Sequence, residues 1–256
     1  MPLLEVKGLS KRFRGLQAVR DFNLTMEPGE IVGLIGPNGA GKTTVFNLIT
    51  GHFPPTGGEV FFREQRLTGL RPYQVAQRGI ARTFQNIRLF KQNSVLDNVR
   101  AAFNTSLRYG LLDAIIRTPR FLAEEKRVTD RALELLELVG LRERAYDMAA
   151  GLPYGAQRRL EMARALALDP VLLLLDEPAA GMNPAEVRQL VSLIRGIKER
   201  FNLTVLVIEH QMGLVMNLCE RVVVMDFGEV IAAGTPAEIR SNPRVLTAYL
   251  GKGAVA

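Results

Sequence analysis

The chain has 256 residues, 47% of them hydrophobic, with a formal net charge of +7 and a pI of about 9.8. This is ample for a buried core in one or two domains, and the single cysteine excludes an internal disulfide. The strongest apolar runs are far shorter than the ~20 residues needed to cross a bilayer, and the first ten residues lack an apolar stretch of signal-peptide length. We therefore expect neither a membrane span nor a signal peptide, and a reducing, cytosolic setting. The basic residues form small separate groups, so ordinary solvated faces and an anionic partner both remain open.

Short strands are predicted at the start of the chain. Leu3–Lys7 and Ala18–Met26 alternate apolar and polar residues, which is typical of half-buried antiparallel strands. Glu30–Ile35 is an apolar strand that ends in a glycine-rich loop, and Thr43–Thr50 follows with helical composition. A further strand is expected at Glu59–Phe62.

The middle of the chain has a different pattern. No convincing strand is visible from Asn86 to Leu168. Ser94, with Asp97 at the third position after it, is typical of a helix start, and Val128–Val139 carries leucines at helical spacing. We therefore expect an all-helical insert in this region.

Strands and helices alternate again after the insert. The expected strands are Val171–Leu175, Leu203–Ile208, Arg221–Met225 and Glu229–Ala233, and the expected helices are Pro184–Arg200 and Gln211–Leu218. Buried strands that alternate with helices imply a mainly parallel sheet. The prediction is an α/β fold with a mainly parallel core sheet, an antiparallel β subdomain and a helical insert. Its parts are 1–86 (antiparallel strands and first part of the core), 87–168 (helical insert), 169–235 (rest of the core) and 236–256 (C-terminal helical extension).

The loop 36-GPNGAGKTT-44 fits the P-loop pattern and lies between a predicted strand and a predicted helix. Its glycines let backbone N–H groups wrap a polyphosphate, and the following helix presents its positive end to the anion. Lys42 would reach the β- and γ-phosphates, and Thr43 would place its hydroxyl on Mg²⁺. A chance glycine turn before a helix is the alternative. The nucleotide-binding residues predicted here are Gly36, Pro37, Asn38, Gly39, Ala40, Gly41, Lys42, Thr43 and Thr44.

Polar side chains follow three other predicted strands. Two carboxylates end the run 171-VLLLLDEP-178, and the carboxyl ends of parallel strands are where ligands bind. Asp176 is placed to hold Mg²⁺ through water, and Glu177 to orient the attacking water and accept its proton. His210, after another buried run, can donate to a γ-phosphate, and Gln85 in 83-TFQN-86 can complete a Mg²⁺ shell or contact water. A helix cap at the acids and an ordinary edge histidine are the structural alternatives.

These motifs, in this order and with a glycine turn before QRRLEMARAL, resemble the ATP-binding subunits of ABC transporters over essentially the whole chain. The finer marks RTFQNIRLF, DEPAAGMNP, IEHQMGLVM and GTPAEIRSNPRVLTAYLG are most similar to the cassettes of branched-chain amino-acid permeases, and the chain looks like the first of the two paralogous ATPases. The resemblance implies an ATPase with Glu177 as catalytic carboxylate, His210 as switch histidine and Gln85 as a metal- and water-contacting residue. It also implies that Phe13 stacks on adenine, for which core packing is the alternative.

The resemblance also assigns a signature motif, which would act on the ATP bound by a partner subunit. Its residues here are Leu152, Pro153, Tyr154, Gly155 and Ala156. Pro153 stands where serine is usual, so the hydroxyl contact to a γ-phosphate is put in doubt while the backbone contacts remain. Asn183 stands where many cassettes carry aspartate, and it can still donate or accept a hydrogen bond across an interface.

The implied cofactors are ATP and Mg²⁺. The implied partners are transmembrane permease subunits, a paralogous or identical ATPase subunit in an ATP-sandwich dimer and, indirectly, an extracytoplasmic substrate-binding protein. The resemblance places the chain peripherally on the cytoplasmic face of the inner membrane and suggests import of branched-chain amino acids. Urea, amides or a lipid remain alternative cargoes, because cargo is chosen by other subunits. A non-transport ABC ATPase acting on nucleic acid or ribosomes is disfavoured by the single cassette and by the lack of an aromatic-interleaved basic patch, so no nucleic-acid partner is expected.

Overall fold

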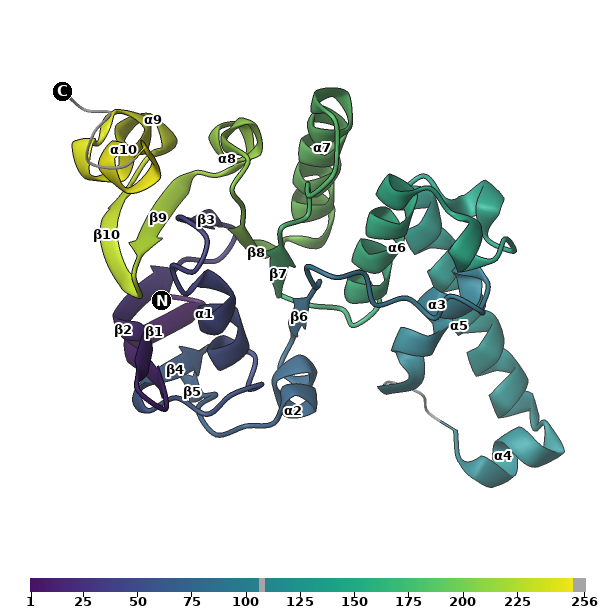
Figure 1. Cartoon of the computed structure of the whole chain (residues 1–256). Helices are drawn as coiled ribbons and strands as arrows, with labels where there is room; N and C mark the ends of the chain where they lie inside the picture. The colour runs from purple at the N-terminus through teal and green to yellow at the C-terminus, as the bar shows by residue number, and fades with distance from the viewer. Residues whose placement is uncertain (106–108, 251–256) are drawn as a thin grey trace. The chain divides into compact units, whose positions relative to one another are not determined.

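The computed structural model describes residues 1–105 and 109–250 (Figure 1). Its Cα positions divide the chain into two compact units, one of Met1–Gln85 with the chain from Val171 onward, and one of Asn86–Pro170. The predicted helical insert, 87–168, lies within the second unit. None of the helices in the described ranges combines the length and the apolar character that crossing a bilayer requires.

An antiparallel sheet forms the first part of the first unit. In the described residues its strand order is β2 (Leu16–Met26), β1 (Leu4–Phe13), β4 (Gly57–Phe62) and β5 (Gln65–Arg66). The β1–β2 pairing runs from Leu4 opposite Met26 to Phe13 opposite Leu16, with register shifts between Val6 and Arg12. Both strands are longer than predicted, because the shifted register lets the pairing continue past the end of the regular alternation. Because β1 is extended, Phe13 is its last residue.

A second, mainly parallel sheet forms the core of the first unit. Its order in the described residues is β10 (Glu229–Gly234), β9 (Arg221–Asp226), β3 (Ile31–Ile35), β8 (Thr204–Ile208), β7 (Leu172–Asp176) and β6 (Ile80–Arg82). β3, β8 and β7 pair in parallel and every residue in them is buried, which explains their continuous apolar sequences. β7 ends at Asp176, one residue beyond the predicted strand, so the first carboxylate lies at the carboxyl end of a buried strand.

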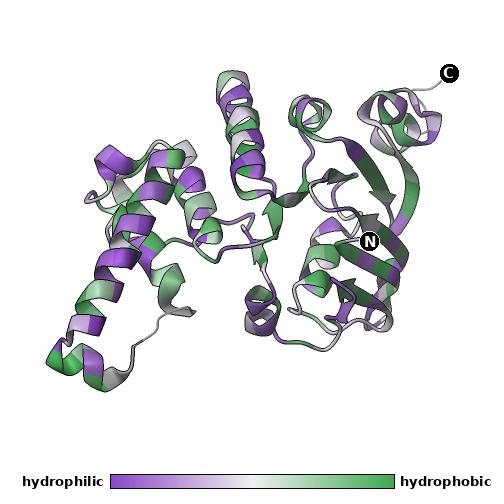
Figure 2. Ribbon diagram, turned by 180° about the vertical axis from the view of Figure 1, so that it is seen from behind, coloured by the Kyte–Doolittle hydropathy of each residue, from purple (hydrophilic) through white to green (hydrophobic). Residues whose placement is uncertain are grey.

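The helices of the first unit connect or follow these strands. They are α1 (Lys42–Ile49), α2 (Pro72–Gln77), α7 (Pro184–Phe201), α8 (Met212–Leu218), α9 (Pro236–Ser241) and α10 (Pro243–Leu250). α7 begins at Pro184 as predicted, and it buries Val187, Leu190 and Ile194 at helical spacing. In Figure 2 the strands of the parallel sheet are mostly hydrophobic, whereas α7 carries both hydrophobic and hydrophilic residues.

The second unit is helical in its described residues, apart from an isolated bridge between Ser94 and Met148. Its helices are α3 (Val95–Arg100), α4 (Leu111–Ile116), α5 (Pro119–Leu138) and α6 (Tyr154–Leu166), with short 3-10 turns at Ala101–Thr105, Arg142–Arg144 and Ala149–Gly151. The Ser94 hydroxyl accepts a hydrogen bond from the backbone N–H of Asp97 at 3.0 Å, which confirms the predicted helix start. The predicted fold class, an α/β cassette with an antiparallel subdomain and a helical insert, is confirmed.

Candidate functional site

A cavity of about 560 Å³ opens in the first unit at the P-loop. It is lined by Phe13, Leu16, Gln17, Ala18, residues 38–44, Gln85, Glu177 and Phe227. Most of the residues predicted to bind nucleotide are therefore gathered at one site. Four of the predicted residues lie outside this lining: Gly36, Pro37, Asp176 and His210. Four lining residues were not predicted from the sequence: Leu16, Gln17, Ala18 and Phe227. Their positions depend on hairpin turns far from the P-loop in sequence.

The P-loop glycines are required by the backbone. Gly36 and Gly41 have φ values of 147° and 101°, and a Cβ would lie 2.0 Å from the Met225 carbonyl oxygen at Gly36 and 2.4 Å from the Ala18 carbonyl oxygen at Gly41. Gly41 then precedes α1, whose first turn has no acidic residue and no side-chain cap. The positive end of this helix is therefore available to an anion, as the phosphate-binding prediction requires.

Lys42 folds back over the P-loop. Its ammonium group donates to the carbonyl oxygens of Gly36 and Pro37 at 2.7 and 2.8 Å, and the residue is 6% exposed. Burial lowers the pKa of Lys42, and the nearby carboxylates Glu177 and Asp176 partly oppose that shift. The cation is thus held in place over the loop that would wrap a polyphosphate.

Glu177 lies between the other two predicted catalytic side chains. The Gln85 Nε2 donates to Glu177 Oε2 at 2.8 Å, and His210 Nδ1 is 3.9 Å from Glu177 Oε1. Glu177 has a left-handed φ of 47°, while its N–H donates to the Ile208 carbonyl at 2.9 Å. A non-glycine residue held in this conformation carries local strain, which is often associated with functional sites. The carboxylate faces the cavity with 15% of its side chain exposed, so it can contact a water molecule there.

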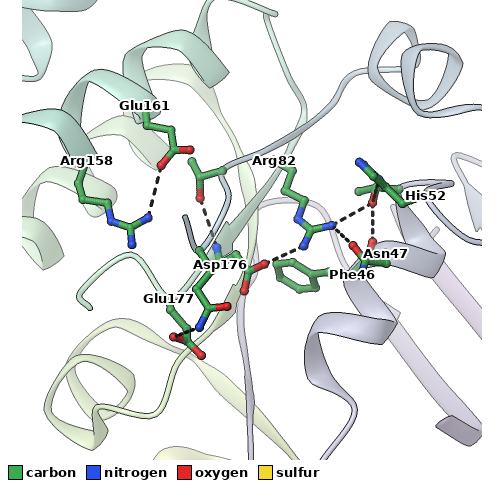
Figure 3. Close-up of polar contacts among 11 residues, drawn as sticks. Phe46, Asn47, His52, Arg82, Arg158, Glu161, Asp176 and Glu177 are labelled. Carbon is green, nitrogen blue, oxygen red and sulfur yellow. Dashed lines mark hydrogen bonds and ion pairs between the residues drawn. The ribbon is translucent and has the colours of Figure 1, made fainter. Parts of the chain in front are cut away.

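Asp176, the residue before Glu177, is 1% exposed. Arg82 at the end of β6 donates through Nη2 to Asp176 Oδ2 at 2.7 Å (Figure 3). The described residues contain no cluster of three or more His, Cys, Asp or Glu side chains arranged to hold a metal. The predicted donors Thr43, Gln85 and Asp176 instead offer hydroxyl, amide and carboxylate oxygens. This hard-oxygen set fits Mg²⁺, which binds few protein groups and keeps waters and substrate phosphates in its shell.

Phe13 is exposed at the edge of the cavity. The residue is 38% exposed, and its ring packs edge-to-face against Phe53, with centroids 5.4 Å apart. Lys11 Nζ lies 5.0 Å from the ring centroid of Phe13. This excludes the core-packing alternative. The Phe227 side chain, 87% exposed at the β9–β10 turn, adds a second aromatic ring to the lining.

Two further residues near the site were not assigned from the sequence. Glu209 is fully buried and accepts hydrogen bonds from the N–H groups of Ala179, His210 and Gln211 at 2.8, 3.0 and 3.2 Å. Gln211 Nε2 donates to the Ala179 carbonyl at 2.8 Å. Both the backbone N–H and the carbonyl of Ala179 are therefore hydrogen-bonded to the segment that carries His210. For Glu209 the sequence signal was a carboxylate at the end of a buried apolar run.

The predicted signature residues lie at the start of α6, in the second unit. Leu152 and Ala156 are buried, whereas Tyr154 is 45% exposed. Pro153 is the N-cap of the helix rather than a residue of its first turn, and no side chain caps that end. The Tyr154 hydroxyl accepts from Nη2 of the buried Arg158 at 2.8 Å, so the motif is held by a residue one turn further along.

Asn183 also has a role within its own chain. Its Oδ1 accepts from the N–H groups of Ala185 and Glu186 at 2.9 and 3.1 Å, and Glu186 Oε2 accepts from the Asn183 N–H at 2.9 Å. This is a capping box at the start of α7. The same oxygen that could contact a partner is therefore already engaged in capping.

Known proteins share both the sequence and the fold. A family model described as ABC transporter matches residues 19–180, and one described as branched-chain amino acid ATP-binding cassette transporter matches residues 229–255. The chain is 49% identical to the high-affinity branched-chain amino acid transport ATP-binding protein LivG of Escherichia coli K12 and 46% identical to BraF of Pseudomonas aeruginosa, covering 98% of each chain in both comparisons. The ADP conformation of MJ1267, an ATP-binding cassette of an ABC transporter, superposes with a TM-score of 0.85 at 29% identity, over 98% of this chain and 100% of that one. The resemblance drawn from the motifs is confirmed, and the chain belongs to the ABC transporter family as an ATP-hydrolysing cassette.

Proposed function

We propose that this cassette hydrolyses ATP to power import of branched-chain amino acids through a membrane permease. The observation that carries the proposal is the arrangement of Gln85 and His210 on either side of the Glu177 carboxylate, which lines the P-loop cavity. The cargo is proposed from the relatives LivG and BraF, whose names describe branched-chain amino acid transport.

The chain's own residues supply most of the chemistry. Backbone N–H groups of the P-loop and the positive end of α1 would hold the phosphates, with the Lys42 ammonium turning from its carbonyl partners toward the β- and γ-phosphates. Glu177, oriented by Gln85, would align the attacking water and accept its proton. His210 would donate to the γ-phosphate from the other side of Glu177. Phe13 would stack on the adenine ring.

Thr43, Gln85 and Asp176 would hold Mg²⁺, with Asp176 acting through water. The ion would neutralise charge on the β- and γ-phosphates. The support for this assignment is the donor chemistry of the three side chains and the position of Asp176 at the carboxyl end of β7, the strand that precedes Glu177.

The working unit would be a dimer with a second, identical or paralogous cassette. The first turn of α6, with Leu152–Ala156, would meet the ATP on the partner's P-loop, and Asn183 would lie near that interface. The uncapped N-terminus of α6 supports an anion contact through backbone N–H groups in place of a serine hydroxyl. The dimer would bind transmembrane permease subunits at the cytoplasmic face of the inner membrane and receive cargo indirectly from an extracytoplasmic binding protein.

Substitution of the catalytic acid tests the ATPase assignment. Glu177→Gln should retain ATP affinity while turnover falls by ~10² or more, the scale of losing a general base. The measurements are equilibrium binding of an ATP analogue and phosphate release by the purified chain. Lys42→Ala is the complementary variant, which tests the P-loop and should lose tight ATP binding. Parent-like turnover in Glu177→Gln removes that residue from the role of base, and retained micromolar affinity in Lys42→Ala removes the P-loop assignment.

The cargo requires a separate test. Pull-down of the tagged chain from detergent-solubilised membranes should recover two permease subunits and a second cassette. Vesicles containing that complex, supplied with its binding protein, should accumulate leucine, isoleucine or valine only with ATP. Uptake of urea, amides or a lipid instead would reassign the cargo while leaving the ATPase function intact.

A further inference from the structure

Arg82 joins the P-loop helix to the acid at the end of β7. Its Nη2 donates to Asp176 Oδ2 at 2.7 Å, and its Nη1 donates to Asn47 Oδ1 at 2.7 Å and to Thr50 Oγ1 at 3.3 Å. Asn47 lies in α1 and Thr50 directly follows it. The guanidinium group therefore bridges the helix that starts at Lys42 and the strand that ends at Asp176 (Figure 3).

The arginine side chain is locked in position by its surroundings. It is 7% exposed, and its guanidinium carbon lies 5.4 Å from the ring centroid of Phe46 and 5.1 Å from that of Phe84. Phe46 is fully buried within α1. Aromatic faces attract a planar cation and restrict its tilt, so the direction of each N–H is set before any ligand binds.

We infer that Arg82 is a positioning residue for the magnesium–nucleotide site, acting through Asp176. This inference rests on the Mg²⁺ role of Asp176 proposed above. A buried carboxylate that accepts a hydrogen bond at one oxygen has a fixed orientation, so its other oxygen can be presented to a metal-bound water. Arg82 holds one oxygen of the Asp176 carboxylate. It thereby sets the orientation of the carboxylate plane, and so of the other oxygen, relative to Thr43 at the start of α1.

The planar fork of arginine is needed for this task. Asp176 and Asn47 accept from two different nitrogens of one rigid group, which constrains the positions of the two acceptor oxygens relative to each other. A lysine ammonium at this position would keep the charge, yet it has a single nitrogen on a flexible stem. The sequence carried no sign of the pairing, because Arg82 and Asp176 are far apart in the chain and meet only through the parallel pairing of β6 with β7.

The test measures how Mg²⁺ changes nucleotide affinity, not only turnover. The purified full chain would be titrated with a fluorescent ATP analogue in excess EDTA and across a Mg²⁺ series. Arg82→Met should leave the affinity in EDTA within about two-fold of the parent but raise the half-saturating Mg²⁺ concentration about 10- to 100-fold, the usual loss when a group that orients a metal ligand is removed. Arg82→Lys should give an intermediate loss.

Arg78→Met is the matched control. Arg78 lies just before β6 and donates to Gln65 on an exposed surface, so its loss should leave the Mg²⁺ dependence unchanged. If Arg82→Met fails to fold, Asn47→Ala provides the same test, because it removes one anchor of the guanidinium group and keeps the ion pair. It should weaken the Mg²⁺ effect to a smaller extent.

The outcomes separate the inference from the proposal beneath it. A parent chain whose nucleotide affinity does not respond to Mg²⁺ overturns the metal assignment itself, and this inference with it. A responsive parent with folded Arg82 or Asn47 variants that keep its Mg²⁺ dependence, or bind Mg²⁺ more tightly, overturns the positioning role alone.

Discussion

Glu177 and Glu209 follow neighbouring strands of the parallel sheet, but their carboxylates have different surroundings. Glu177 faces the cavity and accepts from the Gln85 amide, with 15% of its side chain exposed. Glu209 is fully buried, and burial raises its pKa although three backbone N–H donors oppose the shift. Glu177 can therefore contact a water molecule in the cavity, whereas Glu209 organises the backbone around His210.

The raised pKa of Glu209 predicts a specific pH dependence of stability. A carboxyl group whose pKa is higher in the folded than in the unfolded chain stabilises the fold below its unfolded pKa, which is ordinarily 4.5. This contribution is lost as pH rises through the folded pKa. The glutamine in Glu209→Gln cannot ionise, so this variant does not lose that stabilisation as pH rises. The melting temperature of the parent relative to that of Glu209→Gln should therefore fall as pH rises from about 4 to about 8.

Thermal unfolding of the two proteins at matched pH values measures this difference, and the other carboxylates cancel in the comparison. A parent that gains stability over Glu209→Gln as pH rises would contradict the buried-carboxyl assignment.

At the scale of elements, α7 depends on the residues at its start. Asn183 accepts two backbone N–H groups and Glu186 accepts a third, so most of the donors that the first turn leaves unpaired are satisfied. Pro184 at the first helical position sets φ for the helix at no cost in hydrogen bonding. The loop between Glu177 and α7 is thereby fixed at its α7 end.

Asn183→Ala should destabilise the isolated chain by about 1 kcal/mol, because the helix loses its capping oxygen. For a chain of this size this corresponds to a fall of roughly 2–4 °C in melting temperature, measured by circular dichroism or calorimetry. Asn183→Asp keeps the oxygen and adds a charge that favours the helix start, so it should match or exceed the parent. An unchanged melting temperature in Asn183→Ala would leave the partner interface as the only role for this residue.

At the scale of the whole molecule, the residues proposed to act on one ATP are divided between the two compact units. The P-loop and Glu177 belong to the first unit, and Leu152–Ala156 belongs to the second. In the proposed dimer the two units of one chain would therefore act on different nucleotides.

Tyr154→Gly tests that division. It should leave ATP affinity of the isolated chain unchanged, since the motif would act on the partner's nucleotide, but it should weaken ATP-driven dimerisation. Sedimentation of the Glu177→Gln background with and without ATP measures the effect, and Tyr154→Phe controls for loss of the hydroxyl that Arg158 contacts. A loss of ATP affinity in the monomer would mean that the motif acts within its own chain.

Local sequence predicted the buried strands and the P-loop. Continuous apolar runs identified the buried strands β3, β7 and β8, because both faces of a parallel sheet are covered. The spacing of Gly36, Gly41 and Lys42 between a strand and a helix predicted the phosphate loop, because the backbone there needs conformations that only glycine adopts freely. Asp176, Glu177 and His210 were predicted from their positions at strand ends.

Tertiary structure alone decided which side chains meet. Three sets of contacts join residues that are distant in the chain. Arg82 pairs with Asp176, Glu209 and Gln211 hydrogen-bond to Ala179, and Phe227 lines the cavity beside the P-loop. Strand ends were mispredicted by one or more residues where irregular register or a terminal polar residue extended the pairing, as at Phe13 and Asp176. Periodicity and glycine spacing report on the local backbone, whereas these contacts depend on strand order and register, which are set by how the whole sheet packs.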